Sequence, residues 1–196
     1  MRLNKLAQAA ILATTVVAFS GSYVHAEEFF ARLDGFQELG ALNNQTGAIL
    51  SEGRGTLHLD LDRTSQTATF TLTYSNVGTT APLTGTVTQA HIHFGKVHSS
   101  GGVMVFFCAN PPIVPPPGTQ TCPLNSGTVT GTFTAASVRA IAGQNVNAGD
   151  FDALEDALTS NTAYANVHTT TLPAGEIRGQ IRRGDGDDHH DKHHDK

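Results

Sequence analysis

The feature of this sequence that most constrains its fold is an alternation of apolar and polar residues with a period of two. Leu57, Leu59 and Leu61 alternate with polar neighbours, and a second stretch rich in β-forming residues follows at 67–74. Successive side chains of a β-strand point to opposite faces of a sheet, so the pattern predicts strands with one buried face and one solvated face. We expect further strands at 85–94, 103–108, 127–133, 163–168 and 176–182, with 103–108 central in the sheet because it is apolar on both faces.

A single stretch has helical spacing. Asp150 can cap a helix over 151–159 that carries Phe151, Leu154 and Leu158 on one face, and a shorter turn is expected over 135–140. Short strands separated by glycine and proline turns outnumber these helices. The sequence therefore predicts an all-β fold, an antiparallel Greek-key-like β-sandwich or flattened barrel with one or two short helices.

The two ends of the chain differ in composition from the region between them. Residues 1–26 carry Arg2 and Lys5, then an apolar run, then Val24-His25-Ala26. This order is typical of a secretory signal peptide, and we expect cleavage after Ala26 and a secreted or periplasmic protein. Residues 184–196 contain no apolar side chain, and we expect a disordered tail rich in histidine and aspartate. One domain is expected over 27–183.

The charge balance excludes one class of partner. Residues 27–196 contain 10 basic and 17 acidic side chains, a net charge of −7. Nucleic-acid binding requires a basic face, so we expect no nucleic-acid partner. After the signal, no apolar run approaches the roughly 20 residues that span a bilayer, so we expect no membrane span.

The chain has two cysteines, Cys108 and Cys122, separated by a proline-rich loop. An even number of cysteines in an exported chain favours a disulfide. The alternative is a metal-bound or catalytic thiol, but no basic residue lies nearby in the sequence to lower the thiol pKa. We expect a structural disulfide between them.

His91 and His93 form the most informative motif. Two residues apart on a strand, they share one sheet face with Cβ atoms about 6.5–7 Å apart, so both imidazoles can bind one metal ion. Val87 and Gln89 are expected on this same face. The alternative is a pair of surface histidines on a solvated strand. His98 follows in a glycine-flanked loop, and His168 ends an alternating strand, so each can add a ligand to the pair.

Two further groups of histidines need separate interpretation. His58 alternates with three leucines and is expected to face solvent. The tail pairs four histidines with aspartates, either as a second, flexible metal-binding tract or as an acidic solubilising tail. These tail histidines are His189, His190, His193 and His194.

Several segments together resemble one family. They are Ala90-His-Ile-His-Phe-Gly95, Gly101-Gly102, Gly127-Thr-Val-Thr-Gly-Thr-Phe-Thr-Ala135, Phe151-Asp-Ala-Leu154, Ala163-Tyr-Ala-Asn-Val-His-Thr169 and Pro173-Ala-Gly-Glu-Ile-Arg-Gly-Gln-Ile181. In this order they resemble the CHRD (chordin) domain of secreted bacterial proteins over roughly residues 29–182. That domain is similar in outline to the copper/zinc superoxide dismutase β-sandwich. The resemblance implies copper ligands at His91, His93, His98 and His168, with Arg178 near the metal.

The sequence departs from the dismutase pattern. No histidine lies between His98 and His168, so the zinc ligands of that enzyme family have no counterpart. We therefore expect an exported protein that binds, stores or delivers a transition metal, copper first and zinc as the alternative. Two other interpretations stay open. One is an extracellular module that interacts with another protein without a functional metal, and the other is a dismutase-like copper enzyme.

Overall fold

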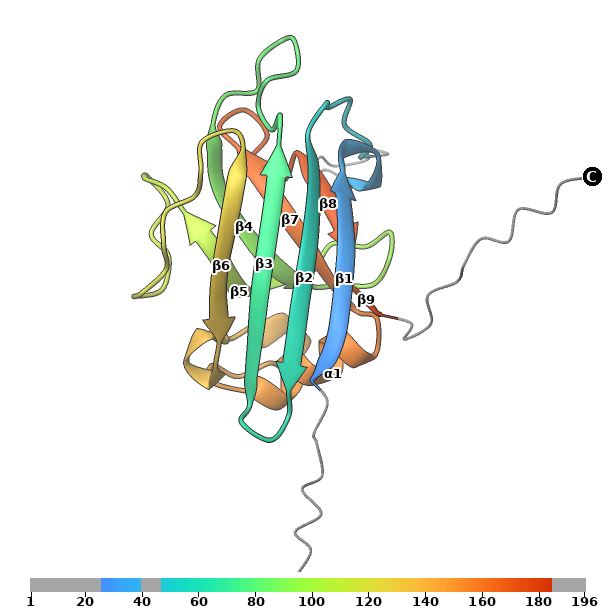
Figure 1. Cartoon of the computed structure of the whole chain (residues 1–196), viewed down its shortest axis with the longest axis vertical. Coiled ribbons are helices and arrows are strands. Elements are labelled where there is room, and N and C mark those ends of the chain that lie inside the picture. The colour runs from blue at the N-terminus through green and yellow to red at the C-terminus, as the bar shows by residue number, and fades with distance from the viewer. Residues whose placement is uncertain (1–25, 40–46, 185–196) are drawn as a thin grey trace, which may run out of the picture.

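The computed structural model describes residues 26–39 and 47–184, and in this part of the chain the dominant element is one antiparallel sheet of nine strands (Figure 1). The strand order is β5-β4-β7-β8-β1-β2-β3-β6, and the short β9 pairs with β1. The strands are β1 (Glu27–Asp34), β2 (Arg54–Asp62), β3 (Thr67–Ser75), β4 (Val87–Phe94), β5 (Gly102–Ala109), β6 (Gly127–Phe133), β7 (Ala163–Thr169), β8 (Ile177–Gln180) and β9 (Arg182–Arg183). The expected signal peptide, the tail and its histidines lie outside the described residues, apart from Ala26 and Gly184.

The predicted all-β class and most of the predicted strands are confirmed. One strand was missed: β1 carries Phe29, Ala31 and Leu33 on its buried face, and the same period of two would have found it. The prediction that 103–108 is central was wrong, because β5 ends the strand order. Its second face is apolar for another reason: Phe106 packs there against the ring of His91.

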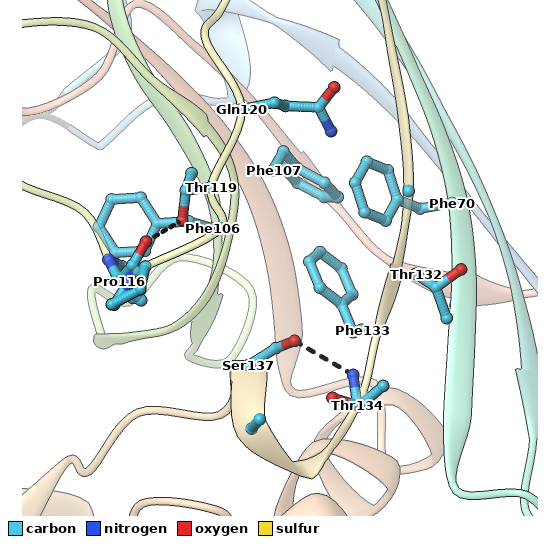
Figure 2. A pocket seen from close by; sticks show the side chains of 14 residues that line it. Phe70, Phe106, Phe107, Pro116, Thr119, Gln120, Thr132, Phe133, Thr134 and Ser137 are labelled. Carbon is cyan, nitrogen blue, oxygen red and sulfur yellow. Dashed lines mark hydrogen bonds between the residues drawn. The ribbon is translucent and has the colours of Figure 1, made fainter.

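The sheet curves into a flattened barrel whose inner face forms the hydrophobic core. No hydrogen-bonded ladder joins the two end strands, β5 and β6, in the described chain. The rings of Phe70, Phe107 and Phe133 gather at this seam (Figure 2), at centroid distances of 4.5–5.5 Å. Gln120 also spans the seam, because its carbonyl accepts from the Ala109 N–H and its side chain donates to the Thr130 carbonyl.

The helices lie in the connections. The helix α1 (Phe151–Thr159) lies across one end of the barrel and buries Phe151, Leu154 and Leu158 (Figure 1). The Asp150 carboxylate caps it by accepting from the Ala153 N–H, as the sequence predicts. The expected turn after Thr134 is the 3₁₀ helix η2 (Ala135–Ser137), and two further 3₁₀ turns are η1 (Gly35–Gln37) and η3 (Ala142–Gln144).

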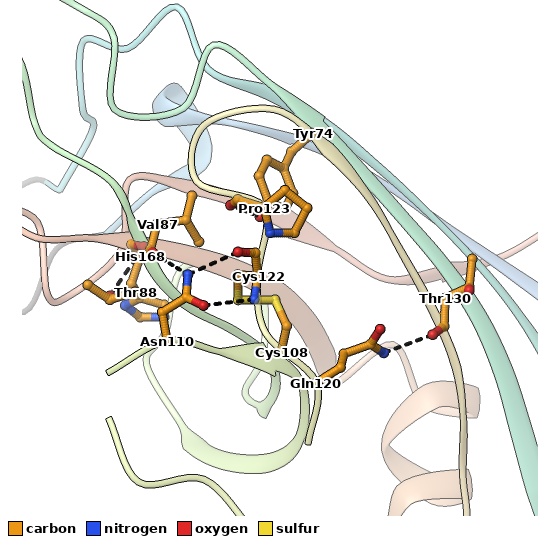
Figure 3. The surroundings of a disulfide bond; sticks show 10 residues. All are labelled: Tyr74, Val87, Thr88, Cys108, Asn110, Gln120, Cys122, Pro123, Thr130 and His168. Carbon is orange, nitrogen blue, oxygen red and sulfur yellow. Dashed lines mark hydrogen bonds between the residues drawn. A yellow bond between two sulfur atoms is a disulfide. The ribbon is translucent and has the colours of Figure 1, made fainter. Parts of the chain in front are cut away.

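The predicted disulfide is present. Cys108 at the end of β5 is bonded to Cys122, which lies in the segment that crosses the seam (Figure 3). Asn110 supports this arrangement from within the loop, since its amide donates to the carbonyls of Val87 and Cys122 and accepts from the Cys122 N–H. The bond therefore ties β5 to the chain that leads into β6.

A buried carboxylate joins the connections at the other end of the barrel. Glu176 is completely buried, and its two oxygens accept four hydrogen bonds. The donors are Ser51 Oγ at 2.7 Å, the Gly78 N–H at 2.9 Å, Thr84 Oγ1 at 2.5 Å and Thr169 Oγ1 at 2.8 Å. These donors precede β2, follow β3, precede β4 and end β7, so one side chain holds four separate segments together.

Replacing this carboxylate should destabilise the fold. Glu176→Gln preserves the size of the side chain but turns one acceptor oxygen into a donor, which leaves buried donors unpaired. We expect the free energy of unfolding to fall by about 2–4 kcal/mol in urea denaturation. Glu52→Gln, at an exposed position, is the control and should change it by less than about 0.5 kcal/mol. Equal urea midpoints for the two variants would contradict this role of Glu176.

Candidate metal centre

The register between β4 and β7 places a set of polar side chains on one face of the sheet. Gln89 lies opposite His168, His91 opposite Asn166, and His93 opposite Tyr164. The residues between them, such as Ile92 and Val167, belong to the hydrophobic core. Because side chains alternate along each strand, the polar set lies on the face that points away from this core.

This outer face is nevertheless buried. His91, His93 and His168 are only 2%, 9% and 4% exposed, because the connections after β4 and β7 pass over them. Arg178 of β8 holds the first of these connections, since its guanidinium donates to the carbonyls of Lys96 and Ser99 at 3.2 and 3.0 Å. The histidines of the sequence motif are therefore not surface residues of a solvated strand.

The three imidazoles converge. His91, His93 and His168 each offer a ring nitrogen, and these atoms all lie within 4.8 Å of one another. The His91 ring centroid lies 4.5 Å from that of His93 and 4.4 Å from that of His168. A metal–nitrogen bond is about 2.0–2.1 Å long, so two nitrogens bound to the same ion are at most about 4.2 Å apart. The ring nitrogens of the cluster lie within 4.8 Å of one another, so small side-chain adjustments suffice to complete a three-nitrogen site.

Hydrogen bonds to backbone carbonyls orient two of the rings. His93 Nδ1 lies 2.8 Å from the Gly101 carbonyl, and His168 Nδ1 lies 3.0 Å from the Pro173 carbonyl. A carbonyl only accepts, so each Nδ1 carries the proton and each neutral ring presents an Nε2 lone pair. Such backbone support of the second nitrogen is typical of histidines that bind metals.

The nitrogens left over have no partner within the described structure. His91 Nδ1, His93 Nε2 and His168 Nε2 are buried atoms without a hydrogen bond to any described residue. Buried polar atoms are nearly always satisfied in folded proteins, because leaving one unpaired costs about 1–3 kcal/mol. All three atoms belong to one histidine cluster, so no protein hydrogen bond competes for these nitrogens.

Burial keeps these histidines neutral. Burial, together with the positive charge of Arg178, lowers the pKa of His93 to about 4. Burial also lowers the pKa of His168 to about 3, and electrostatic repulsion between His168 and His93 contributes in the same direction. The pKa of His91 is also well below its usual value, chiefly through burial and then through His168 and His93. Neutral imidazoles are the form that binds metal ions.

A stack of side chains supports the cluster from one side. The Tyr164 ring lies parallel to His93 with centroids 4.7 Å apart, and the Arg178 guanidinium carbon lies 3.4 Å from the Tyr164 centroid. The Tyr164 hydroxyl accepts from the Gly101 N–H at 3.3 Å, the residue whose carbonyl orients His93. This stack restricts the orientation of the His93 ring.

A cavity of about 300 Å³ adjoins the histidines and is lined also by Glu38, Tyr164 and Arg178. The carboxylate of Glu38, which is 3% exposed, accepts from the Asn166 side chain at 2.9 Å. Glu38 was not predicted, because it follows η1 outside any periodic pattern. Asn166 could have been found, because it alternates with Ala165 and Val167 in the same way as His168.

The remaining predicted site residues lie elsewhere. His98 is exposed in the connection after β4, with a left-handed backbone (φ 60°), and does not belong to the converging group. His58 lies on the outer face of β2 and stacks on Phe30 at 4.6 Å. Val87, expected beside the histidines, lies in the core because a register shift between Val87 and Gln89 reverses its direction.

A second cavity, of about 340 Å³, lies at the β5–β6 seam (Figure 2). It is lined by aromatic, proline, glycine, alanine and uncharged polar residues, and none of its lining residues is titratable. It therefore offers neither a metal ligand nor an acid or base, and the histidine cluster is the better candidate for a functional site.

Comparison with known proteins agrees with this architecture. The family model described as the CHRD domain matches residues 29–181, and the chain belongs to the CHRD domain family. This domain is typical of extracellular proteins. No curated protein and no solved structure matches the chain significantly. Within the described residues, no helix is long and apolar enough to cross a membrane.

The lowered pKa values predict how stability depends on pH. In the unfolded chain both histidines have a pKa of about 6.5, whereas in the metal-free native state His93 has a pKa of about 4 and His168 of about 3. Between these values the unfolded chain binds protons at the two histidines and the native state does not. The free energy of unfolding should therefore fall as the pH falls through this range, by up to about 1.4 kcal/mol per pH unit for each histidine.

Urea denaturation of the metal-free protein at several pH values measures this dependence. The His93→Gln/His168→Gln variant has no imidazole at these positions, so it should lose less stability than the wild type between pH 7 and 4. Parallel curves for the two proteins would show that these histidines titrate normally in the folded state.

Proposed function

We propose that this CHRD domain protein binds one transition metal ion through His91, His93 and His168, and that copper is the preferred ion with zinc as the alternative. The observation that carries the proposal is the set of three buried ring nitrogens that converge and lack any other described partner. In a purely structural histidine cluster these nitrogens would be paired with protein groups, and the described residues supply no such partner.

The donor set favours copper over other ions. Three neutral imidazole nitrogens suit copper and zinc, while the oxygen-rich sites of calcium and magnesium need carboxylates and carbonyls. Among divalent ions that accept such donors, copper binds most tightly by the Irving–Williams order. The adjoining cavity leaves room for a further ligand on the side away from the strands.

The proposed role is binding, storage or delivery of the ion outside the cell. Reversible binding requires a donor set and access from solvent, and the histidine cluster with its cavity supports both requirements. The orientation of His93 and His168 by backbone carbonyls prepares the site before the ion arrives, which lowers the entropic cost of binding.

A protein-interaction module is the second candidate function. Its support is a pair of apolar side chains, Leu83 and Leu124, which are 73% and 60% exposed. Their two connections are joined, because Asn125 donates to the Gly85 carbonyl. This interpretation gains weight if the histidine cluster holds no metal.

Copper titration of the full chain tests the proposal. His189, His190, His193 and His194 are all replaced by asparagine, so that the tail does not contribute. We expect one tightly bound Cu(II) per chain, with nitrogen hyperfine structure in the electron paramagnetic resonance spectrum. A further His168→Gln substitution should weaken binding by at least about 100-fold, since it removes one of three ligands.

His98→Asn in the same background is the matched control and should leave copper binding unchanged, because His98 lies outside the cluster. Circular dichroism verifies that each variant is folded. If the protein with the substituted tail binds no copper, or if His168→Gln binds as tightly, the proposed site is wrong.

A further inference from the structure

A groove of about 350 Å³, lined by other residues than the cavity beside the histidines, lies on the outer side of the barrel. It is formed by β1, η1, β8, β9 and the connection after β4. Three of its lining residues are arginines and none is acidic. The lining residues are Phe30, Ala31, Arg32, Gln37, Val97, Gln180, Arg182 and Arg183.

The positive charge of this groove is only partly neutralised. Arg183 forms an ion pair with Glu27 at the edge of β1. Arg32 and Arg182 are exposed and form no ion pair with any other residue of the described chain. Residues 27–183 contain 8 basic and 12 acidic side chains, so a groove that gathers three of the eight is a local reversal of the charge of the domain.

The groove also has an apolar floor. Phe30 and Val97 are each 43% exposed, and Phe30 lies directly opposite Arg182 in the β1–β9 pairing. A groove that combines unpaired arginines with exposed apolar surface suits an acidic, extended peptide better than a small inorganic anion.

An acidic segment of this chain begins at the edge of the groove. The last described residue, Gly184, follows Arg182 and Arg183 directly and donates its N–H to the Glu28 carbonyl at 2.8 Å. Residues 185–196 contain five aspartates, and three of them, Asp185, Asp187 and Asp188, come within the first four positions. Their charge is opposite to that of the groove.

Reach and direction allow this segment to enter the groove. β9 runs antiparallel to β1, so the chain at Gly184 heads away from Arg32, but Gly184-Asp185-Gly186 is a sequence typical of turns. From Glu28 to Arg32 is about 13 Å along a strand. The twelve residues 185–196 span up to about 40 Å when extended.

We propose that the groove is an intramolecular docking site for residues 185–196, in which Asp187 and Asp188 pair with Arg182 and Arg32. Because the segment is covalently attached at the edge of the groove, its effective concentration is high, and modest ion pairs suffice to hold it. The docking does not depend on whether the buried histidine cluster holds copper.

Nuclear magnetic resonance of the metal-free full chain tests this contact. We compare the wild type with Asp187→Lys/Asp188→Lys at low ionic strength. The backbone amides of Phe30, Arg32, Val97 and Gln180 should shift between the two proteins. In the wild type, about 0.5 M NaCl should move these signals toward their positions in the variant, because salt screens exposed charges.

Charge reversal in the groove supplies the controls. Arg182→Glu should abolish the response of the groove amides to the tail substitutions. A variant that combines Arg32→Glu/Arg182→Glu with Asp187→Lys/Asp188→Lys again has opposite charges on groove and tail. Docking should therefore be restored, and the groove amides should again differ from those of Arg32→Glu/Arg182→Glu alone. Arg139→Glu makes the same change of charge beside Phe106, outside the groove, and should leave the response intact.

Two outcomes would overturn the proposal. In one, the groove amides do not respond to the tail substitutions, or they respond equally after Arg182→Glu. In the other, the difference between the two proteins disappears on dilution, which would show that the tail docks on a second copy of the chain.

Discussion

The arrangement of this domain depends on the buried carboxylate of Glu176. A charged group removed from water is tolerated only when hydrogen bonds replace its hydration, and four donors do so here. Those donors come from segments beside β4 and β7 in one half of the strand order and beside β2 and β3 in the other half. The carboxylate therefore fixes how the two halves of the sheet meet, and with them the connection from β7 to β8 that covers the histidines.

The candidate metal centre follows from an unusual use of sheet geometry. Most β-sandwiches bury one sheet face and solvate the other, but here β4 and β7 are buried on both faces. The inner face packs in the hydrophobic core, and the outer face lies under two connections. Polar side chains on that second face require partners, and Arg178, Tyr164, Gly101 and Pro173 supply them for most of the set. The three remaining ring nitrogens, His91 Nδ1, His93 Nε2 and His168 Nε2, have no hydrogen-bond partner among the described residues.

Much of the fold and part of the site could be predicted from the sequence. The alternation along 57–61 and 127–133 identified β2 and β6, and Asp150 identified the start of α1. His91 and His93 share a face because the β-strand period is a local property. The inclusion of His168 rested on family resemblance and on its own alternation, and the register of β7 with β4 brings it to the pair. His98 was the less firmly predicted ligand, and it lies in an exposed turn with a left-handed backbone, outside the converging group.

The sequence by itself determined the class of fold, the pairing of the two cysteines and the shared face of the His-x-His pair. Each of these follows from local periodicity or from a count that leaves one solution. The tertiary structure alone decided which strands are neighbours, that the outer face of β4 is buried, and that Glu38 and Asn166 lie beside the histidines. It also decided that arginines from β1 and β9 form one groove. These properties depend on contacts between residues far apart in the sequence, such as Asn166 with Glu38 and Arg182 with Phe30, and such contacts leave no periodic signal in a single chain.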